Sequence, residues 1–385
     1  MLNLTLKRIF SIFSAIIILT LMCGNAFADE TDKEHTFCEV LVEVSSGAVI
    51  ESVNGDVPVP VGTMAKLMTV LLTAEKIEAG ELSVDDKLKT SQNANSMQGA
   101  QIWLMPGEEI TVNELLKGVI IGNANDASVV LAEKVGGDTE KFTELMNLRA
   151  AELGMENTVF TNCNGYYDYG KQVSAAVDLA KLCAELSKYE FLREYFTCWR
   201  DFVRGGETEL VNANELVKDY KGMIGFKAGY TENSGYCIAA GAERDGVTYI
   251  SVVLGCGDKY DCFTEAKRLL NMGFSGYTAF VPELPQKDIP QSVAVKGGMT
   301  RHTAVECGEV RSVVLPNGAV DTLSVSVIVP DYIYAPVEKG DKIGEVHFSR
   351  GGKMLFAVDI TAAESVEKIN ILKAMGIMLK NILTF

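Results

Sequence analysis

Apolar positions recur every three or four residues through most of the chain between residues 37 and 279, and this period is typical of helices that pack against a core. It predicts helices over residues 64–82, 138–155, 173–189 and 265–277, and two helices within 111–137 separated by the segment GNAND. Runs rich in β-branched residues predict strands in 38–62, with a turn at Asn54-Gly55-Asp56, and in 235–256, with a turn at 243–246. Because strands lie at both ends of this region, we expect an α/β domain whose first and last strands are neighbours, in a sheet flanked by helices.

The pattern changes after about Val281. The segment PELPQKDIPQ reads as a proline-bearing linker, and short β-branched runs separated by Gly, Pro and Asn follow it. These runs are 291–298, 303–310, 311–316, 323–330 and 342–349. They predict a small all-β domain over residues 281–363.

The two ends of the chain have patterns of their own. Lys7 and Arg8 precede an apolar run, and Ala26-Phe27-Ala28 offers the small residues of a cleavage site, so residues 1–28 are predicted to be a signal peptide. A retained membrane anchor and a lipoprotein attached through Cys23 are the alternatives. Residues 364–385 place apolar side chains on one helical face and lysines on the other, which predicts an amphipathic helix at the membrane surface or, alternatively, one packed on its own domain.

The charge and the cysteine and histidine content exclude several kinds of partner and site. The net charge is −16, and removing residues 1–28 would take away two cations and no anions, so nucleic acid is excluded as a partner. The cysteines are scattered without a C-x-x-C motif, and we expect mostly free, buried thiols. The three histidines are isolated, so we expect no metal or cofactor and no Ser-His-Asp triad.

A hydroxyl and an amine are spaced for chemistry at the start of the first helix. Thr63 and Lys66 are three residues apart, and residues at this spacing share a helix face. Backbone N–H groups at a helix N-terminus favour a developing anion. The T-x-x-K pattern alone is common, and it gains meaning only from its surroundings.

Those surroundings resemble a known family. The stretches FCEVLVEVSSGAVIES, VPVPVGTMAKLMT, MQGAQIWLMPGEEITVNELLKGVIIGNANDASVVLAEKVGG, SAAVDLAKL and YKGMIGFKAGYTENSGYCIAAGAERDG occur in this order. Together they resemble the low-molecular-weight penicillin-binding proteins that act as D-alanyl-D-alanine carboxypeptidases, the S11 serine peptidase family. The resemblance implies a penicillin-binding, β-lactamase-like transpeptidase domain over residues 29–280, an antiparallel sheet flanked by helices. The β domain and the terminal helix at 364–385 also fit this layout.

The resemblance assigns catalytic roles to three positions. Thr63 stands where the family serine is acylated by the stem peptide of peptidoglycan or by a β-lactam. Lys66 stands where a neutral amine acts as general base. Asn123 stands where a second serine relays the proton to the leaving group.

It also assigns substrate-binding roles. Asn125 stands where an amide holds the substrate backbone, and Lys227 supplies a cation near the terminal carboxylate. Ala228 stands where a threonine hydroxyl binds that carboxylate, and Gly229 completes the K-T-G motif as Lys-Ala-Gly. The backbone N–H groups of Thr63 and Tyr230 would form the oxyanion hole.

Each of the three motifs departs from the family at its hydroxyl residue. Thr63 keeps the hydroxyl but adds a methyl group and restricts the rotamers. Asn123 carries an amide, which neither gains nor loses a proton near neutral pH. Ala228 removes a hydrogen bond to a charged group, which is worth about 1.5–3 kcal/mol.

Two hypotheses follow. In the first, the protein is a D-alanyl-D-alanine carboxypeptidase of the cell envelope that trims stem peptides through Thr63. In the second, it is a non-catalytic peptidoglycan binder or regulator of the same fold. A β-lactamase is disfavoured because no acidic residue suits deacylation. Trp103 and the methionines are predicted to be core residues, and Asn164-Gly165-Tyr166 is predicted to be a structural turn.

Overall fold

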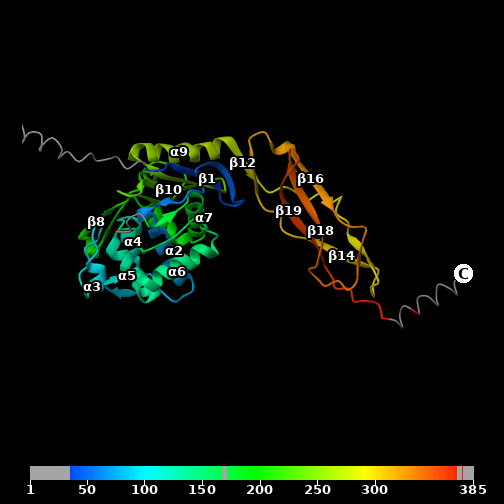
Figure 1. The fold of residues 1–385 in the computed structure, drawn as a ribbon, viewed down its shortest axis with the longest axis horizontal. Coiled ribbons are helices and arrows are strands. Elements are labelled where there is room, and N and C mark those ends of the chain that lie inside the picture. Colours follow the sequence, from blue (N-terminus) through cyan, green and yellow to red (C-terminus); the bar gives the residue numbers. More distant parts are fainter. Residues whose placement is uncertain (1–34, 167–170, 371–374, 376–385) are drawn as a thin grey trace, which may run out of the picture. The chain divides into compact units, whose positions relative to one another are not determined.

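An antiparallel sheet forms the centre of the larger domain in this computed structural model, which describes residues 35–166, 171–370 and 375. The sheet has five strands in the order β2-β1-β11-β10-β9 (Figure 1). The strands are β1 (Cys38–Glu43), β2 (Ala48–Val53), β9 (Met223–Thr231), β10 (Gly235–Arg244) and β11 (Val247–Cys256). The prediction that the first and last strands are neighbours is confirmed, because β1 pairs with β11 along its whole length.

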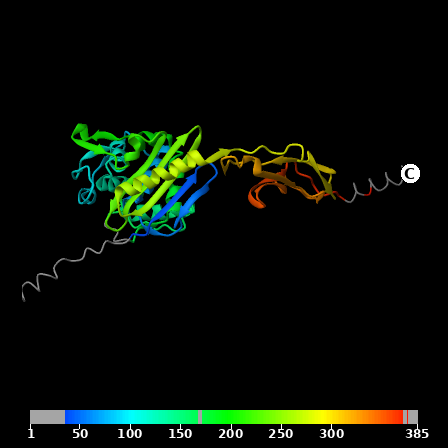
Figure 2. The ribbon, with the colours of Figure 1, turned by 90° about the horizontal axis from the view of Figure 1, so that it is seen from above.

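Helices cover both faces of this sheet. On one face lies α9 (Lys259–Gly276), which packs its buried side chains against Ile238, Tyr249 and Val253 (Figure 2). The other face carries the remaining helices, which share one large hydrophobic core with the sheet. They are α2 (Lys66–Glu78), α3 (Gln92–Asn95), α4 (Val112–Ile120), α5 (Asn125–Gly136), α6 (Thr139–Glu152), α7 (Ala176–Leu186) and α8 (Arg193–Thr197). The predicted long helices are therefore confirmed.

The first hairpin turns earlier in the sequence than expected. Its reversal lies at residues 44–47, where the Glu43 carboxylate accepts hydrogen bonds from the backbone N–H groups of Ser45 and Ser46. The turn predicted at Asn54-Gly55-Asp56 exists, but it follows β2 and leads to the short strand β3 (Val59–Pro60), which pairs with β6 (Val173–Ser174). Two further antiparallel pairs were not predicted. One pairs β4 (Lys87–Lys89) with β5 (Glu109–Thr111) across residues 90–108, and the other is a short hairpin of β7 (Arg200–Val203) and β8 (Thr208–Val211).

The C-terminal domain is all-β, as predicted. Its main sheet has six strands in the order β16-β18-β19-β14-β13-β17, and β12 pairs with β15 in a separate ribbon. The strands are β12 (Tyr277–Phe280), β13 (Ser292–Lys296), β14 (His302–Cys307), β15 (Val313–Pro316), β16 (Leu323–Ile328), β17 (Tyr332–Tyr334), β18 (Lys342–Arg350) and β19 (Lys353–Ala362). Its core includes stacked rings of Phe348 and Phe356, with centroids 4.6 Å apart.

The predicted terminal segments lie wholly or mostly outside the described residues. This holds for the signal peptide at 1–28 and for most of the amphipathic helix at 364–385. The predicted start of that helix is wrong, because residues 364–370 are not helical and Val366 and Lys368 instead form bridges with the β domain. Met375 is helical and exposed. Among the helices of the described residues, none has the length and apolar character needed to cross a bilayer.

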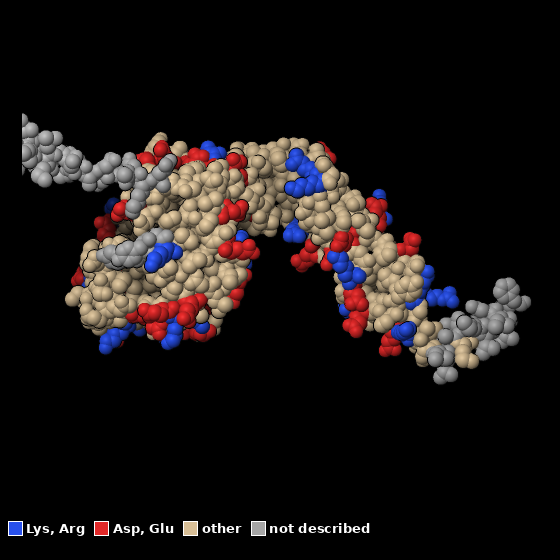
Figure 3. Space-filling model, viewed as in Figure 1, with Lys and Arg blue, Asp and Glu red and all other residues tan. Residues whose placement is uncertain are grey.

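The distribution of charged side chains and the state of the cysteines can be compared with what the composition predicted. On the face shown in Figure 3, acidic and basic side chains are interspersed, and an acidic group lies over α5 and α6. That face offers no extended basic patch for a phosphate backbone. The eight cysteines of the described residues are all free, and six of them are buried.

Candidate active site

Thr63 lies at the start of the first long helix and against the edge strand of the sheet. The residues Gly62–Ala65 form a single turn of 3-10 helix that continues directly into α2. Thr63 is 6 % exposed, and a Cβ atom added at Gly229 of β9 would lie only 2.0 Å from its Oγ1 atom. The absence of a side chain at Gly229 therefore lets the Thr63 hydroxyl lie against the strand, and any larger residue at position 229 would displace that hydroxyl.

The Lys66 amine lies one helical turn further on and is fully buried. Its Nζ atom donates a hydrogen bond of 2.6 Å to the carbonyl oxygen of Asn164. Burial lowers the pKa of Lys66 well below its usual value, and the positive charge of Lys227 lowers it further. A lysine in this environment holds a neutral amine at a pH where an exposed lysine is charged, which is what a general base requires.

A second nucleophilic group, the Cys163 thiol, lies near this amine. Burial raises the pKa of Cys163 to about 12, although the nearby charge of Lys66 acts in the opposite direction. A thiol with that pKa carries almost no thiolate at neutral pH and is not activated. Cys163 therefore does not replace Thr63 as the predicted nucleophile.

The turn between α4 and α5 brings the second motif to the site. Asn123 has a φ of 55°, a left-handed conformation that Asn adopts more readily than most residues. Asn125, the first residue of α5, is buried and donates from Nδ2 to the Gln98 carbonyl oxygen at 2.6 Å. The buried Oδ1 atoms of Asn123 and Asn125 have no hydrogen-bond partner among the described residues.

The third motif lies on β9, and alternation along the strand divides its residues. Lys227 and Gly229 face the helices and Thr63, whereas Ala228 faces away and packs with Ile238 in the cluster beneath α9. The Lys227 amine is buried and has no partner among the described residues, and burial lowers its pKa to about 7.

Tyr230 ends the motif at the rim of the site. Its side chain is exposed and stacks on Tyr236 of β10, with ring centroids 4.6 Å apart. Within the described sheet, β9 is an edge strand that pairs only with β10. No strand of the described residues pairs with its outer backbone edge, which is the kind of edge that an extended peptide can pair with.

The segment Asn164-Gly165-Tyr166, predicted to be a plain structural turn, contributes to the site. Gly165 has a φ of 74°, and a Cβ atom there would lie 1.8 Å from the Gly62 carbonyl oxygen, so only glycine fits. The Tyr166 ring lies beside Gly99 and the Asn125 amide. Sequence reasoning missed this placement, and the Asn-Gly dipeptide signalled a turn without showing what it touches.

Trp103 is not a core residue, so that prediction is wrong. Its side chain is 65 % exposed and its φ is 55°. The neighbours Ile102 and Leu104 take the core positions, and their backbone N–H groups donate to the Asp126 carboxylate at 3.1–3.2 Å. Asp126 thus fastens the loop that carries Trp103 to the N-terminus of α5.

Comparison with known proteins assigns the class. Residues 25–258 match the family described as D-alanyl-D-alanine carboxypeptidase, and residues 283–368 match the C-terminal domain of penicillin-binding protein 5. The chain is 33% identical to D-alanyl-D-alanine carboxypeptidase DacF of Bacillus subtilis, over 94% of this chain and 95% of that one. It is 29% identical to D-alanyl-D-alanine carboxypeptidase DacC of Escherichia coli, over 91% and 90% of the two chains. The chain therefore belongs to the D-alanyl-D-alanine carboxypeptidase family.

Solved structures agree with this assignment. Penicillin binding protein 5 of Haemophilus influenzae superposes with a TM-score of 0.78 at 25% identity, over 86% of this chain and 97% of that one. Ampicillin-bound penicillin-binding protein D2 of Listeria monocytogenes superposes with a TM-score of 0.57 at 28% identity, over 62% of this chain and 97% of that one. The fold predicted from the sequence, a penicillin-binding domain followed by an all-β domain, is confirmed.

Proposed function

We propose that this protein removes the terminal D-alanine from peptidoglycan stem peptides by acyl transfer through Thr63, with Lys66 as general base. One observation carries the proposal. The Oδ1 atoms of Asn123 and Asn125 and the Nζ atom of Lys227 are buried in the three motifs without partners among the described residues. Buried polar groups are costly to leave unpaired, so a site that contains several of them is prepared for a polar ligand.

The ligand chemistry follows from the charges. A D-Ala–D-Ala carboxylate would approach the Lys227 ammonium, and Asn125 would bind the peptide backbone on the other side of the scissile bond. Thr63 Oγ1 would attack the carbonyl carbon while its proton passes to Lys66 Nζ. Because Asn123 cannot transfer a proton, the proton that the leaving amine needs would come back from Lys66. Water would then release the acyl group as the shortened peptide.

The relatives support the substrate class and the compartment. Their names describe D-alanyl-D-alanine carboxypeptidases, and the Listeria structure was solved with ampicillin bound. We therefore propose that the protein is exported, works in the cell envelope outside the cytoplasmic membrane, and also binds β-lactams. The part of the predicted amphipathic helix that follows residue 370 would hold it to the membrane surface.

The test is the mass of the intact protein after incubation with a penicillin, followed by peptide mapping. We expect one adduct on Thr63 and none in Thr63→Ala. Thr63→Ser should acylate about tenfold faster, a barrier change on the order of 1.4 kcal/mol, because it removes the methyl group beside the reacting oxygen. Thr69→Ser removes the same methyl group from the same helix, where the hydroxyl binds the Cys163 carbonyl oxygen, and should leave the rate unchanged.

Turnover of a D-Ala–D-Ala peptide by the parent chain is the second measurement. Folded protein that forms no adduct on Thr63, even as Thr63→Ser, would rule out acyl transfer. Binding of the peptide without an adduct would then support a regulatory peptide binder, the alternative that the altered Asn123 and Ala228 positions suggest.

A further inference from the structure

The loop at residues 98–108 presents an exposed tryptophan beside the substrate-binding asparagine. Asn125 donates from its backbone N–H to the Ala100 carbonyl oxygen at 2.7 Å and from its side chain to the Gln98 carbonyl oxygen at 2.6 Å. The Asp126 carboxylate then binds the backbone on both sides of Trp103. The loop that carries Trp103 is thus attached to the first two residues of α5, and the indole ring is exposed.

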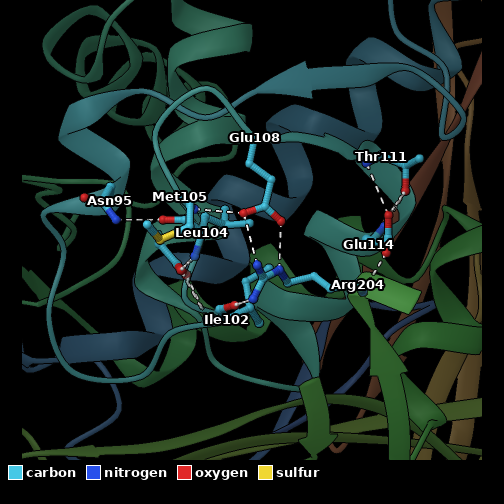
Figure 4. A network of polar contacts seen from close by, with 9 residues as sticks. Asn95, Ile102, Leu104, Met105, Glu108, Thr111, Glu114 and Arg204 are labelled. Atoms are coloured by element: carbon cyan, nitrogen blue, oxygen red, sulfur yellow. Dashed lines mark hydrogen bonds and ion pairs between the residues drawn. The ribbon is translucent and has the colours of Figure 1, made fainter. Parts of the chain in front are cut away.

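Further contacts fix this loop in place (Figure 4). Asn95 donates to the Leu104 carbonyl oxygen at 2.8 Å, and Glu108 accepts from the Met105 backbone N–H at 2.8 Å. Arg204, which follows β7, forms an ion pair of 2.7 Å with Glu108 and reaches the Ile102 carbonyl oxygen. The backbone on either side of Trp103 is therefore held by side chains from separate elements.

This arrangement has a cost that burial of the ring does not offset. A bulky residue with a positive φ is strained, and a tryptophan that is 65 % exposed gains little from packing. Strain of this kind persists only where the surroundings impose it, and it gathers at ligand sites. A rigid aromatic side chain also binds a ligand at low entropic cost, because little motion is lost.

We propose that Trp103 is a specificity-determining residue that binds the part of the stem peptide N-terminal to the scissile bond. The inference rests on the proposed function, which places the terminal carboxylate at Lys227 and the preceding backbone at Asn125. A peptide that extends past Asn125, away from Lys227, meets the loop that carries Trp103. The flat indole suits the aliphatic part of a long side chain at that point, and it also attracts an ammonium group at the end of such a chain.

The chain contains two tryptophans, which permits a direct measurement. In Trp199→Phe, Trp103 becomes the only tryptophan and its fluorescence reports on its own surroundings. We expect a stem pentapeptide ending in D-Ala–D-Ala to change this fluorescence, and the free dipeptide D-Ala–D-Ala to leave it unchanged. The dipeptide serves as the control because it lacks the residues that would reach Trp103.

Substitution separates a binding role from a structural one. Trp103→Gly relieves the positive φ, so its stability to urea should equal or exceed that of the parent, while its Kd for the pentapeptide should rise about tenfold. Trp103→Phe should retain most of the affinity, and the Kd for the dipeptide should be the same in all three proteins. Leu148→Ala, which shortens an exposed apolar side chain on α6, is the matched control and should leave both Kd values unchanged.

The outcomes are distinguishable. A pentapeptide that binds the parent and Trp103→Gly equally would overturn this inference and leave the proposed function intact. A pentapeptide that does not bind the parent would overturn the proposed function, and this inference with it. Loss of affinity for the dipeptide as well in Trp103→Gly would show a general disturbance of the site, and would also overturn the specific role.

Discussion

Lys66 and Lys227 are buried close enough together for the charge of one to lower the pKa of the other. Neither amine belongs to an ion pair in the described part of the chain, and Lys227 has no hydrogen-bond partner there. A folded protein rarely keeps two such amines together unless they have a use, because each loses its hydration. We therefore infer that stability is sacrificed at this site for the proposed binding and catalysis.

We predict that Lys227→Met stabilises the protein. At pH 7 the gain should be about 1–3 kcal/mol in the free energy of unfolding, the usual cost of an unsatisfied buried polar group. The pKa of Lys227 is about 7 in the folded state and 10.5 in the unfolded state, so the unfolded state binds more protons between these values. Stability of the parent rises with pH across this window, and the gain from Lys227→Met should shrink from pH 7 to pH 10. Urea unfolding at several pH values measures it.

Lys267→Met is the matched control for this prediction. Lys267 is exposed on α9, so its replacement should change stability by less than about 0.5 kcal/mol at any pH. Lys227→Met should also lose affinity for a D-Ala–D-Ala peptide. A destabilised Lys227→Met protein would show that the amine has a structural partner, and would contradict the argument.

At the scale of single residues, the sequence predicted the positions of the three motifs but not the residues that surround them. Thr63, Asn125 and Lys227 could be located because fixed spacings and family motifs mark them. Trp103 and Tyr166 could not, because an aromatic residue in an apolar stretch reads as core. Only the three-dimensional structure shows that Ile102 and Leu104 fill the core on either side of Trp103.

Among the elements, the loop at residues 98–108 depends on one carboxylate. Asp126 is buried, and it accepts hydrogen bonds from Ile102, Leu104 and Ala127. Burial raises the pKa of Asp126, and these backbone donors act in the opposite direction. The carboxylate thus joins the loop to the first turn of α5, where Asn125 lies.

Asp126→Ala should therefore destabilise the protein by about 2–3 kcal/mol, because it leaves buried N–H groups without an acceptor. It should also increase hydrogen exchange at Ile102 and Leu104, which hydrogen-exchange mass spectrometry measures. Glu156→Ala removes an exposed carboxylate and is the control. Unchanged exchange in this loop would show that Arg204 and Asn95 suffice to hold it.

The elements that the sequence predicted are those with a strong period. Helices α2, α4, α5, α6 and α7 each bury an apolar face, and a glycine lies within two residues of the C-terminal end of the first four. The short hairpin β7–β8 and the strand β17 escaped prediction because a few residues give no measurable period. The strand β19 was also missed, although it lies between β18 and β14, because its exposed Met354 and Leu355 blur the alternation.

For the molecule as a whole, the two domains have separate cores. One set of buried residues comes from the carboxypeptidase domain, and another comes from the β domain, including Val346, Phe348 and Ile360. The proposed chemistry uses only residues of the first set and their neighbours. Stability of the β domain and acylation at Thr63 should therefore be independent.

Phe348→Ala tests that independence. Phe348 is fully buried and stacks on Phe356, so its truncation should cost the β domain about 3–5 kcal/mol. Calorimetry should show the transition of the β domain at a lower temperature, and the rate of penicillin adduct formation on Thr63 should stay at the parent value. Leu355→Ala, an exposed leucine on β19, is the control and should move neither quantity. A single unfolding transition at a lower temperature, together with slower acylation, would show that the β domain supports the active site. A cavity at Phe348 can affect Thr63 only if both domains unfold as one cooperative unit.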